Sequence, residues 1–322
     1  MPVIYIGSAC AGLLLLALGF CVYAYRTAFY VGAHNGRTEG YEPPDDVCPP
    51  PVRARLGQLR DDMRCAPKEE VAIRSLEGWR LVGDYYEIRR GAPLHIAFHG
   101  YRSASLADNG GAYRMASAAG HNLLAVDQRA HGRSEGHTIT FGVREADDLL
   151  CWVEYARERF GADVPIFLSG ISMGAATVLI AAGEPLPPNV IGILADCSYT
   201  SPRAILRSVV RGMHLPVGPA YAALRLSARL FGGFDPEERA PLTAVRRARV
   251  PIFFAHGEAD AFVPYAMVHE LHEACTSEKV LFTVPGAAHG MSYLGDTEGY
   301  EAAVRAFEER CLSAYAERRA AT

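Results

Sequence analysis

The stretch IFLSGISMGAATVLI, residues 166–180, decides how the rest of the chain is interpreted. An apolar run at 166–168 leads into Gly170-Ile171-Ser172-Met173-Gly174, and small and apolar residues typical of a helix follow. A serine between two glycines at a strand-to-helix junction is typical of a nucleophile elbow. The turn strains the serine backbone, and the glycines remove side chains that would clash there. We therefore expect the Ser172 hydroxyl to project beyond the sheet at a helix start, whose dipole favours negative charge.

Short apolar runs alternate with longer amphipathic stretches on both sides of this motif. Such alternation predicts a mostly parallel sheet that is covered by helices on both faces. Eight strands are expected, at 71–75, 80–88, 94–98, 123–126, 166–168, 190–194, 252–255 and 280–284. Helices are expected at 111–119, 144–160, 173–183, 264–275 and 297–316.

One interval breaks the alternation of strands and helices. Residues 201–249 separate two predicted strands by 49 residues and contain apolar patches with helical spacing, such as Ile205-Leu206 with Val209-Val210. An insertion of this size and character predicts a helical cap over one end of the sheet.

A serine nucleophile needs an imidazole to take its proton and a carboxylate to orient that imidazole. Asp260 and His289 each lie in a loop directly after a predicted strand, so both are expected at the sheet edge that carries Ser172. Glu258 and Asp196 are alternative positions for the carboxylate, and the loop pattern favours Asp260.

The first 30 residues differ in character from the rest of the chain. Val3 to Tyr25 contains no charged residue, and a helix of this length would extend roughly 35 Å, enough to cross a bilayer core of about 30 Å. A cleaved signal peptide is the alternative, but its basic start, short apolar core and cleavage site are not clear here. We therefore expect an uncleaved transmembrane anchor at 1–30, a Pro-rich linker at 31–69 and a catalytic domain at 70–322.

The residues at the end of this segment bear on its placement in the membrane. The aromatic side chains there are expected in the headgroup layer; they are Tyr23, Tyr25, Phe29 and Tyr30. Arg26 and Arg37 follow the apolar run, so the positive-inside rule favours a single-pass protein of the cell membrane with a cytoplasmic domain. Long domains can cross the membrane regardless of charge, so the side stays open.

Charge and cysteine content exclude several classes of function. The 32 Lys and Arg against 36 Asp and Glu give a net charge of −4, which argues against a nucleic-acid partner. The eight cysteines form no C-x-x-C pair, and His269 and His272 are three positions apart rather than the four of a zinc protease motif. No metal and no cofactor are expected. A Cys48–Cys65 disulfide is an option if the domain is outside the cytoplasm.

Five segments occur in a characteristic order along the chain. They are His99-Gly100, Asp127 to Ser134, Gly170 to Gly174, His256 to Pro264 and Gly286 to Gly290. With these segments, residues 70–316 resemble the α/β-hydrolase superfamily, and more narrowly its membrane-anchored, lipase-like serine esterases. The resemblance implies an α/β-hydrolase fold, with a mostly parallel eight-stranded sheet flanked by helices, a helical cap at about 201–249 and an N-terminal transmembrane helix.

The same resemblance implies a role for each matching residue. Ser172 would be the nucleophile, Asp260 the acid and His289 the general base, while the backbone amides of Tyr101 and Met173 would form the oxyanion hole. The expected substrates are small-molecule or lipid-like carboxylic esters, including acyl-thioesters. A serine peptidase of the same fold is the first alternative, and a non-catalytic binding scaffold is the second. Oligomeric state is left open.

Overall fold

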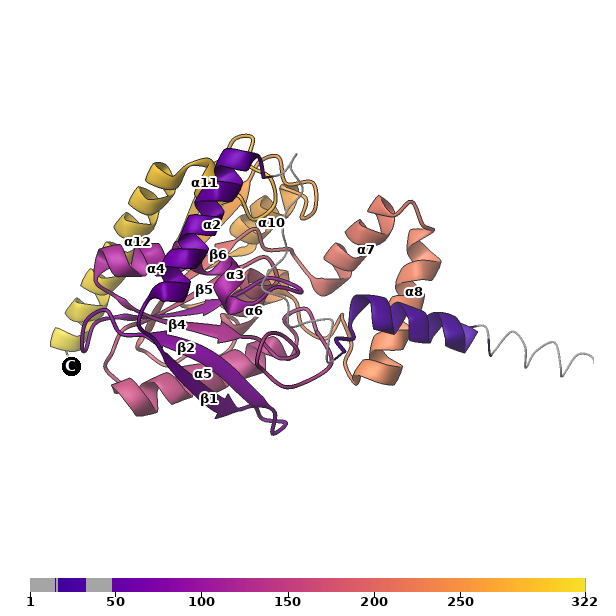
Figure 1. Ribbon diagram of the computed structural model, residues 1–322, viewed down its shortest axis with the longest axis horizontal. Coiled ribbons are helices and arrows are strands. Elements are labelled where there is room, and N and C mark those ends of the chain that lie inside the picture. Colours follow the sequence, from indigo (N-terminus) through magenta and orange to yellow (C-terminus); the bar gives the residue numbers. More distant parts are fainter. Residues whose placement is uncertain (1–14, 16, 33–47, 322) are drawn as a thin grey trace, which may run out of the picture.

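The computed structural model describes residues 15, 17–32 and 48–321. Its centre is an eight-stranded sheet in the order β1-β2-β4-β3-β5-β6-β7-β8 (Figure 1). The strands are β1 (Glu69–Arg74), β2 (Arg80–Tyr86), β3 (Leu94–Phe98), β4 (Asn122–Asp127), β5 (Ile166–Ile171), β6 (Val190–Asp196), β7 (Ile252–Gly257) and β8 (Lys279–Val284). All eight predicted strands are present, with ends shifted by at most a few residues.

The sheet is mixed rather than parallel throughout. β2 pairs antiparallel with both β1 and β4, whereas every pairing from β4 through β8 is parallel. Parallel strands direct their carboxyl ends to one edge of the sheet, so the loops after β3, β5, β6, β7 and β8 meet there. The expectation of a mostly parallel sheet is confirmed.

Helices cover both faces of the sheet. They are α2 (Pro50–Cys65), α3 (Ser105–Asp108), α4 (Gly110–Ala119), α5 (Glu145–Phe160), α6 (Met173–Ala181), α7 (Pro202–Gly212), α8 (Val217–Ser227), the π-helical turn η1 (Ala228–Gly232), α9 (Pro241–Ala244), η2 (Val245–Arg247), α10 (Ala266–Ala274), α11 (Ser292–Gly295) and α12 (Thr297–Ala320). The five helices predicted from sequence correspond to α4, α5, α6, α10 and α12.

Alternating residues along the central strands fill two separate cores. On β7, Phe254 faces the core that includes side chains of α5, α6 and α10, whereas Phe253 faces the core that includes α12. Phe253 packs there against Phe307 and Tyr300, with ring centroids 5.8 and 5.9 Å apart. Strands buried on both faces explain why the sequence shows continuous apolar runs rather than alternation.

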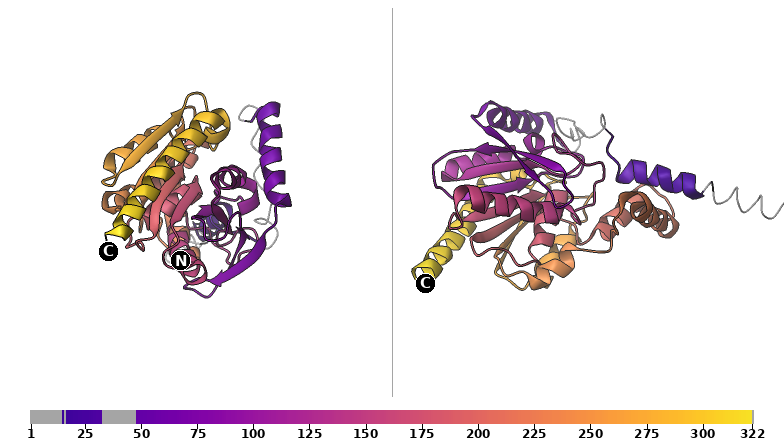
Figure 2. Two further views of the ribbon diagram at one scale, coloured as in Figure 1. Left: turned by 90° about the vertical axis from the view of Figure 1, so that its left-hand side faces the viewer. Right: turned by 90° about the horizontal axis from the view of Figure 1, so that it is seen from below.

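The chain between β6 and β7 forms a lobe that extends beyond the sheet. In Figure 1, α7 and α8 project away from the main body, and the helix of residues 17–28 lies beside them; the view from below in Figure 2 agrees. The rings of Tyr25 and Phe231, 5.7 Å apart, join that helix to the lobe. We call α7, α8 and η1 the cap; they lie within the 201–249 interval expected from sequence.

The predicted membrane span falls only in part on described residues. Residues 1–14 and 16 lie outside them, and the described part forms a helix at residues 17–28. Among the described helices, none combines the length and the apolar character needed to cross a bilayer. The transmembrane anchor is therefore not supported by the described residues, and we return to it below as a proposal.

Phe29 does not lie in a headgroup layer, so that expectation is wrong. Its side chain is 0% exposed and packs between Phe141 and Phe234, with ring centroids 5.8 and 5.4 Å away. The backbone on either side of it joins the loop before α5, since Ile139 N donates to Phe29 O and Val31 N donates to His137 O. Residues 29–31 are therefore part of the folded body.

The predicted linker contains a substantial helix. α2 packs on α4, where a Cβ at Gly110 would come within 2.9 Å of the Leu59 backbone. Arg60 Nε also donates to Ala107 O. The seven described cysteines are all free, so Cys48 and Cys65 form no disulfide. The domain boundaries at 30 and 70 stay predictions.

Replacing Phe29 tests whether the N-terminal segment stabilises the folded domain. Phe29→Ala removes a fully buried ring and is expected to lower the free energy of unfolding by about 3 kcal/mol. Phe20→Ala is the control, because Phe20 is 51% exposed on the preceding helix. Urea unfolding of the full chain measures both; equal effects of the two substitutions would contradict the packing described here.

Candidate active site

Ser172 lies in the turn between β5 and α6 with a backbone φ of 54°. This left-handed conformation is strained for a residue with a side chain, and it is typical of functional sites. The flanking glycines are required because a Cβ at Gly170 would lie 2.2 Å from the Gly174 carbonyl carbon, and one at Gly174 would lie 2.1 Å from Phe98 O. The local structure is therefore the turn expected from the sequence.

The structure brings Ser172, His289 and Asp260 together. His289 Nε2 lies 2.9 Å from Ser172 Oγ, and His289 Nδ1 lies 2.7 Å from Asp260 Oδ2. A carboxylate can only accept, so Nδ1 donates to Asp260 and Nε2 is left to accept the serine hydroxyl proton. This is the arrangement of a serine nucleophile, its base and the group that orients the base.

Asp260 is held as a carboxylate by donors that surround it. Its Oδ1 accepts from the backbone amides of Phe262 and Val263, each at 2.9 Å, and His256 Nε2 lies 3.2 Å from Oδ2. Burial acts to raise the pKa of Asp260, but the hydrogen bonds from His256 and His289 outweigh it and lower that pKa to about 2. Asp260 is therefore ionised throughout the neutral range.

His256 contributes to the environment of the Asp260 carboxylate. Its Nε2 lies 3.1 Å from Val263 O, a contact within its own loop. The same nitrogen faces the Asp260 carboxylate, so His256 also positions the group that orients His289. The buried thiol of Cys197 also lies nearby, with Sγ within 4.8 Å of a carboxylate oxygen of Asp260 and a ring nitrogen of His289.

The alternative acids have other partners. Glu258 Oε1 accepts a hydrogen bond from Thr283 Oγ1 at 2.8 Å, away from His289. Asp196 accepts from Ser292 Oγ at 2.8 Å and from Tyr300 OH at 3.3 Å. Neither carboxyl takes the position beside His289 Nδ1 that Asp260 occupies.

Two backbone amides beside Ser172 are positioned to bind an oxyanion. A Cβ at Gly100 would lie 3.6 Å from Ser172 Cβ, so the loop after β3 passes directly over the serine. The next amide in that loop is Tyr101 N, and Met173 N opens α6. Neither amide donates a hydrogen bond to another described residue. Their role as an oxyanion hole stays a prediction.

The oxyanion-side loop is tied to the N-terminal helix. Tyr101 OH donates to Ala28 O at 2.8 Å, and the Arg102 guanidinium donates to Thr27 O and Tyr30 O at 2.9 and 3.2 Å. Thr27 O and Ala28 O belong to the last turn of the helix, where backbone acceptors lack partners within the helix, and Tyr30 lies just beyond its end. Nothing in the sequence connects segments more than 70 positions apart, so this link appears only in the folded chain.

Hydrogen bonds and an ion pair stabilise the loops that flank the site. His99 Nε2 accepts from Gln128 N and His131 Nε2 accepts from Arg102 N, both at 3.0 Å, so neither histidine is free to act as a base. Arg129 forms a bidentate pair with Asp148, at 2.6 and 2.8 Å. Arg129 therefore has a structural role and links the loop after β4 to α5.

Apolar side chains form one side of the site. A hydrophobic cluster joins the cap, the loop before α5 and Met173 beside the nucleophile; its buried members include Phe141, Tyr199, Ile205, Leu206, Tyr221 and Val263. Tyr101 packs on the edge of this cluster, and Phe262 lies 5.0 Å from the His289 ring. The surroundings of Ser172 therefore favour an apolar group.

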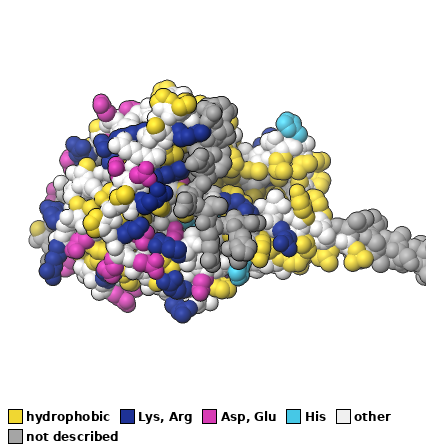
Figure 3. Space-filling model, viewed as in Figure 1, with side chains coloured by type: hydrophobic (Ala, Val, Ile, Leu, Met, Phe, Trp, Pro, Cys, Tyr) yellow, Lys and Arg dark blue, Asp and Glu magenta, His cyan; other side chains and the backbone are white. Residues whose placement is uncertain are grey.

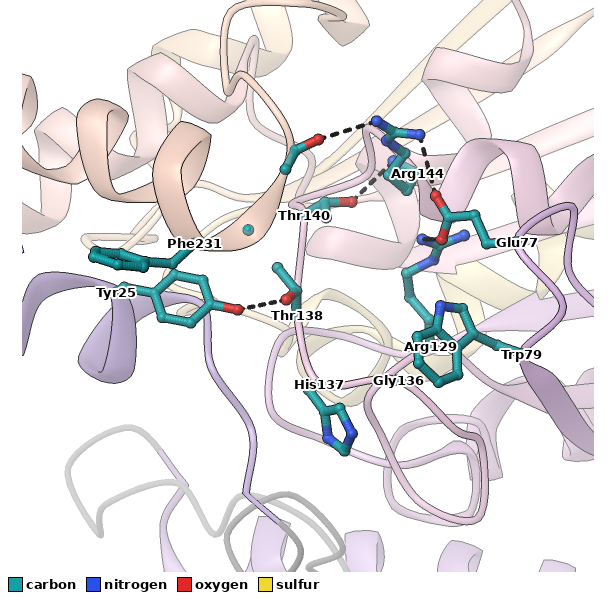
Figure 4. A pocket seen from close by; sticks show the side chains of 12 residues that line it. Tyr25, Glu77, Trp79, Arg129, Gly136, His137, Thr138, Thr140, Arg144 and Phe231 are labelled. Carbon is teal, nitrogen blue, oxygen red and sulfur yellow. Dashed lines mark hydrogen bonds and ion pairs between the residues drawn. The ribbon is translucent and has the colours of Figure 1, made fainter. Parts of the chain in front are cut away.

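A separate cavity of about 530 Å³ lies between the N-terminal helix, η1 and the loop before α5 (Figure 4). It is lined by Tyr25, Glu77, Trp79, Arg129, Gly136, His137, Thr138, Thr140, Arg144, Phe231, Gly232 and Gly233. Glu77 accepts from both Arg129 and Arg144, and Asp148 accepts from Arg129, so the two guanidinium charges are balanced. None of Ser172, Asp260 and His289 lines this cavity.

Comparisons with known families agree with this geometry. A family model described as serine aminopeptidase, S33, matches residues 93–234, and a model of the dienelactone hydrolase family matches residues 222–315. The uncharacterized protein YqkD of Bacillus subtilis (strain 168) is 30% identical over 189 residues. That match covers 58% of this chain and 62% of the relative, so the chain spans less than two thirds of the relative's length.

Solved structures show the same fold. The esterase Pf2001 of Pyrococcus furiosus has a TM-score of 0.62 at 23% identity, covering 78% of this chain and 93% of that one. Est1E of Butyrivibrio proteoclasticus with ferulic acid bound has a TM-score of 0.60 at 19% identity, covering 76% and 99%. The chain has the α/β-hydrolase fold, and the two family matches, each over less than half of the chain, are to hydrolases.

Asp260→Asn tests the geometry around His289. An amide in this position presents a donor to Nδ1, which favours the wrong imidazole tautomer, so the reactivity of Ser172 toward a fluorophosphonate is expected to fall by about 10⁴-fold. Glu258→Gln serves as the matched control and is expected to react at the wild-type rate. A small effect at Asp260 together with a large one at Glu258 would reverse the assignment.

Proposed function

We propose that the protein is a serine hydrolase that cleaves carboxylic esters through an acyl-enzyme on Ser172. The observation that carries this proposal is the pair of short contacts at His289, 2.9 Å to Ser172 Oγ and 2.7 Å to Asp260 Oδ2. The matches to hydrolase families and the fold shared with known esterases support an ester-cleaving enzyme.

In the first half of the reaction, Ser172 Oγ attacks the ester carbonyl while His289 Nε2 takes the hydroxyl proton. The carbonyl oxygen becomes an oxyanion that accepts from Tyr101 N and Met173 N, an interaction worth about 3 kcal/mol for each donor in such sites. Collapse of the intermediate breaks the ester bond, and the leaving alkoxide takes the proton from His289.

Water completes the cycle by taking the role that Ser172 had in the first half. His289 takes a proton from water, the hydroxide attacks the acyl carbon, and the second oxyanion uses the same two amides. Ser172 leaves with the proton from His289 and the carboxylic acid is released. Asp260 stays ionised and keeps His289 in the required tautomer throughout. The mechanism needs no metal and no cofactor.

We infer that the substrates carry an apolar acyl group, as lipid-derived esters and acyl-thioesters do. The support comes from the apolar cluster beside Met173 and from Phe262 at the His289 ring. Burial of an acyl chain stabilises the complex by about 0.8 kcal/mol per methylene group. Activity is therefore expected to rise with acyl length until the space under the cap is filled.

We also propose that the protein is held at the cell membrane by its N-terminal segment, as a single-pass protein with the domain on the cytoplasmic side. Helix 17–28 exposes large apolar side chains, and so does the cap beside it; they are Leu18, Phe20, Val22, Tyr23, Met213, Leu215, Leu226, Leu230 and Phe231. Figure 3 shows hydrophobic side chains gathered over this end of the molecule.

The charge of the cap supports the same proposal. Residues 202–232 contain five arginines and no acidic residue; Arg203, Arg225 and Arg229 form ion pairs with Asp235 or Glu237, and the other two are Arg207 and Arg211. A surface that combines exposed apolar side chains with arginines is suited to an anionic bilayer, because the apolar groups enter the lipid while the arginines face the headgroups. In this arrangement the site would receive substrates from the lipid phase.

A serine peptidase is the second candidate, and the match of residues 93–234 to the serine aminopeptidase model favours it. Amide and ester cleavage use the same triad and oxyanion hole, so the geometry at Ser172 serves both. The apolar cluster beside Met173 and Phe262 at the His289 ring favour esters.

Labelling with a fluorophosphonate probe tests the enzymatic proposal. Wild type is expected to label, Ser172→Ala to lose labelling, and Ser277→Ala, which lies away from the site, to label as wild type does. A folded wild-type protein that does not label, or a Ser172→Ala variant that labels equally well, would refute the proposal.

A substrate panel separates ester from amide cleavage. Nitrophenyl esters of rising acyl length are compared with peptide amides by kcat/KM, and the esters are expected to be preferred, with a rise across the shorter acyl chains. Preference for amides over every ester would favour the peptidase.

Fluorescence quenching tests the membrane surface of the cap. The full chain carrying Leu230→Trp is reconstituted in vesicles of brominated phosphatidylcholine and phosphatidylglycerol, and the added emission is expected to be strongly quenched. Leu76→Trp is the control, because Leu76 is exposed in the turn between β1 and β2, outside the cap. Equal quenching at the two positions would contradict contact between the cap and lipid.

A further inference from the structure

Three potential metal ligands converge at the sheet edge opposite to Ser172. His95 is the second residue of β3, His121 directly precedes β4, and Glu308 lies on α12. β3 and β4 are parallel neighbours, with His95 opposite Leu123, so both histidines belong to the amino-terminal ends of their strands. β3 alone separates this cluster from the loop over Ser172 by roughly 16 Å.

The three side chains are buried together. His95, His121 and Glu308 are 5%, 6% and 6% exposed. His95 Nε2 lies 3.1 Å from His121 Nδ1 and 3.5 Å from Glu308 Oε1, and His121 Nδ1 lies 3.6 Å from Glu308 Oε2. The Glu308 carboxyl therefore faces both rings, and Arg305 is a neighbouring positive charge.

We propose that His95, His121 and Glu308 form a binding site for a single divalent transition-metal ion, with zinc as the preferred ion. Zinc bonds to histidine nitrogen and carboxylate oxygen are about 2.0 to 2.2 Å long. Tetrahedral ligands at that distance are about 3.3 to 3.6 Å apart. The two ring nitrogens are 3.1 Å apart, and each faces one oxygen of the Glu308 carboxylate, His95 at 3.5 Å from Oε1 and His121 at 3.6 Å from Oε2, so the distances are close to this spacing.

The rings are held in place before any ion binds. Phe167 stacks against both, with centroids 5.0 Å from His95 and 6.1 Å from His121 and interplanar angles of 22° and 13°. Preorganised ligands lose little conformational freedom on binding.

The ligand set selects among ions. Two imidazoles and one carboxylate suit zinc and its first-row neighbours, whereas calcium takes six to eight oxygen ligands and magnesium an octahedron of oxygens. Three protein ligands leave a fourth tetrahedral position. His95 and Glu308 line a cavity of about 100 Å³, which offers space there for a water molecule.

This site is distinct from the proposed catalytic centre. The Ser172 mechanism needs no metal, and none of its proposed residues belongs to the cluster. We assign the ion a structural role: it would join the sheet, through β3 and the start of β4, to the final helix α12. The inference does not rest on the proposed hydrolase function.

Metal binding to the full chain, purified without a polyhistidine tag and stripped with a chelator, tests the proposal. We expect one zinc ion per chain, a zinc-dependent rise in the thermal midpoint, and the visible absorption of tetrahedral cobalt when Co²⁺ replaces zinc. Magnesium and calcium are expected to produce none of these changes.

Glu308→Gln preserves side-chain shape and removes the anionic ligand, so zinc affinity is expected to fall by roughly 100-fold or more. His121→Asn provides a second variant with the same expected loss. His269→Ala with His272→Ala is the matched control, because this pair lies on α10, outside the proposed site. Circular dichroism and fluorophosphonate labelling report folding separately from metal content.

Each outcome of these measurements either supports the metal site or overturns it. Loss of the bound zinc in folded Glu308→Gln or His121→Asn, with retention in the His269/His272 control, supports the site. No stoichiometric zinc in wild type, or unchanged zinc binding in both ligand variants, overturns it. Zinc that is lost only in the control places the ion on α10 and also overturns the proposal.

Discussion

The close approach of backbone at the β5–α6 turn is the constraint on which the rest of this structure depends. With no side chain at Gly170 or Gly174, α6 starts directly against the end of β3, where a Cβ at Gly174 would lie 2.1 Å from Phe98 O. This contact places Ser172 in a strained conformation and brings the loop after β3 over it. The nucleophile candidate and the oxyanion donors are therefore positioned by one packing requirement, and neither can move without the other.

The N-terminal segment is coupled to the same loop. Tyr101 and Arg102 donate to carbonyls at the end of helix 17–28, and Phe29 is buried immediately beyond them. The segment proposed to hold the protein at the membrane therefore contacts the residue whose amide is proposed to bind the oxyanion. Such a connection gives a physical reason why membrane attachment and active-site geometry would be interdependent.

Burial has opposite consequences for carboxyl groups at the two edges of the sheet. Asp260 is surrounded by backbone amides and by two histidines, and these donors lower its pKa to about 2 despite burial. Glu308 has no comparable donors, so burial raises its pKa to about 8. The first environment stabilises a charge that catalysis needs. The second has Arg305 as a neighbouring positive charge that does not offset burial, and a bound cation would add to it.

Much of the fold was predictable because strands, helices and the elbow are encoded locally. Eight apolar runs predicted the eight strands, and five amphipathic stretches predicted five of the helices. The positions of Asp260 and His289 after successive strands indicated that both would reach the edge that carries Ser172. Because parallel strands end at one edge of the sheet, the order of these residues along the chain predicted that they would lie close together in the fold. Glu258 and Asp196 could not be excluded as acids in this way, since they follow strands of the same edge.

The sequence by itself determined the α/β-hydrolase fold, the cap interval and the residues that meet at Ser172, because each depends on periodicity or on a short motif. Only the tertiary structure decided that Phe29 is buried in the body, that His256 supports Asp260, that Tyr101 and Arg102 hold the N-terminal helix, and that His95 and His121 face Glu308. Except for His256 and Asp260, which are four positions apart, these contacts join positions dozens to hundreds of residues apart. They follow from the strand order β4-β3-β5 and from the packing of α12, which no local pattern encodes.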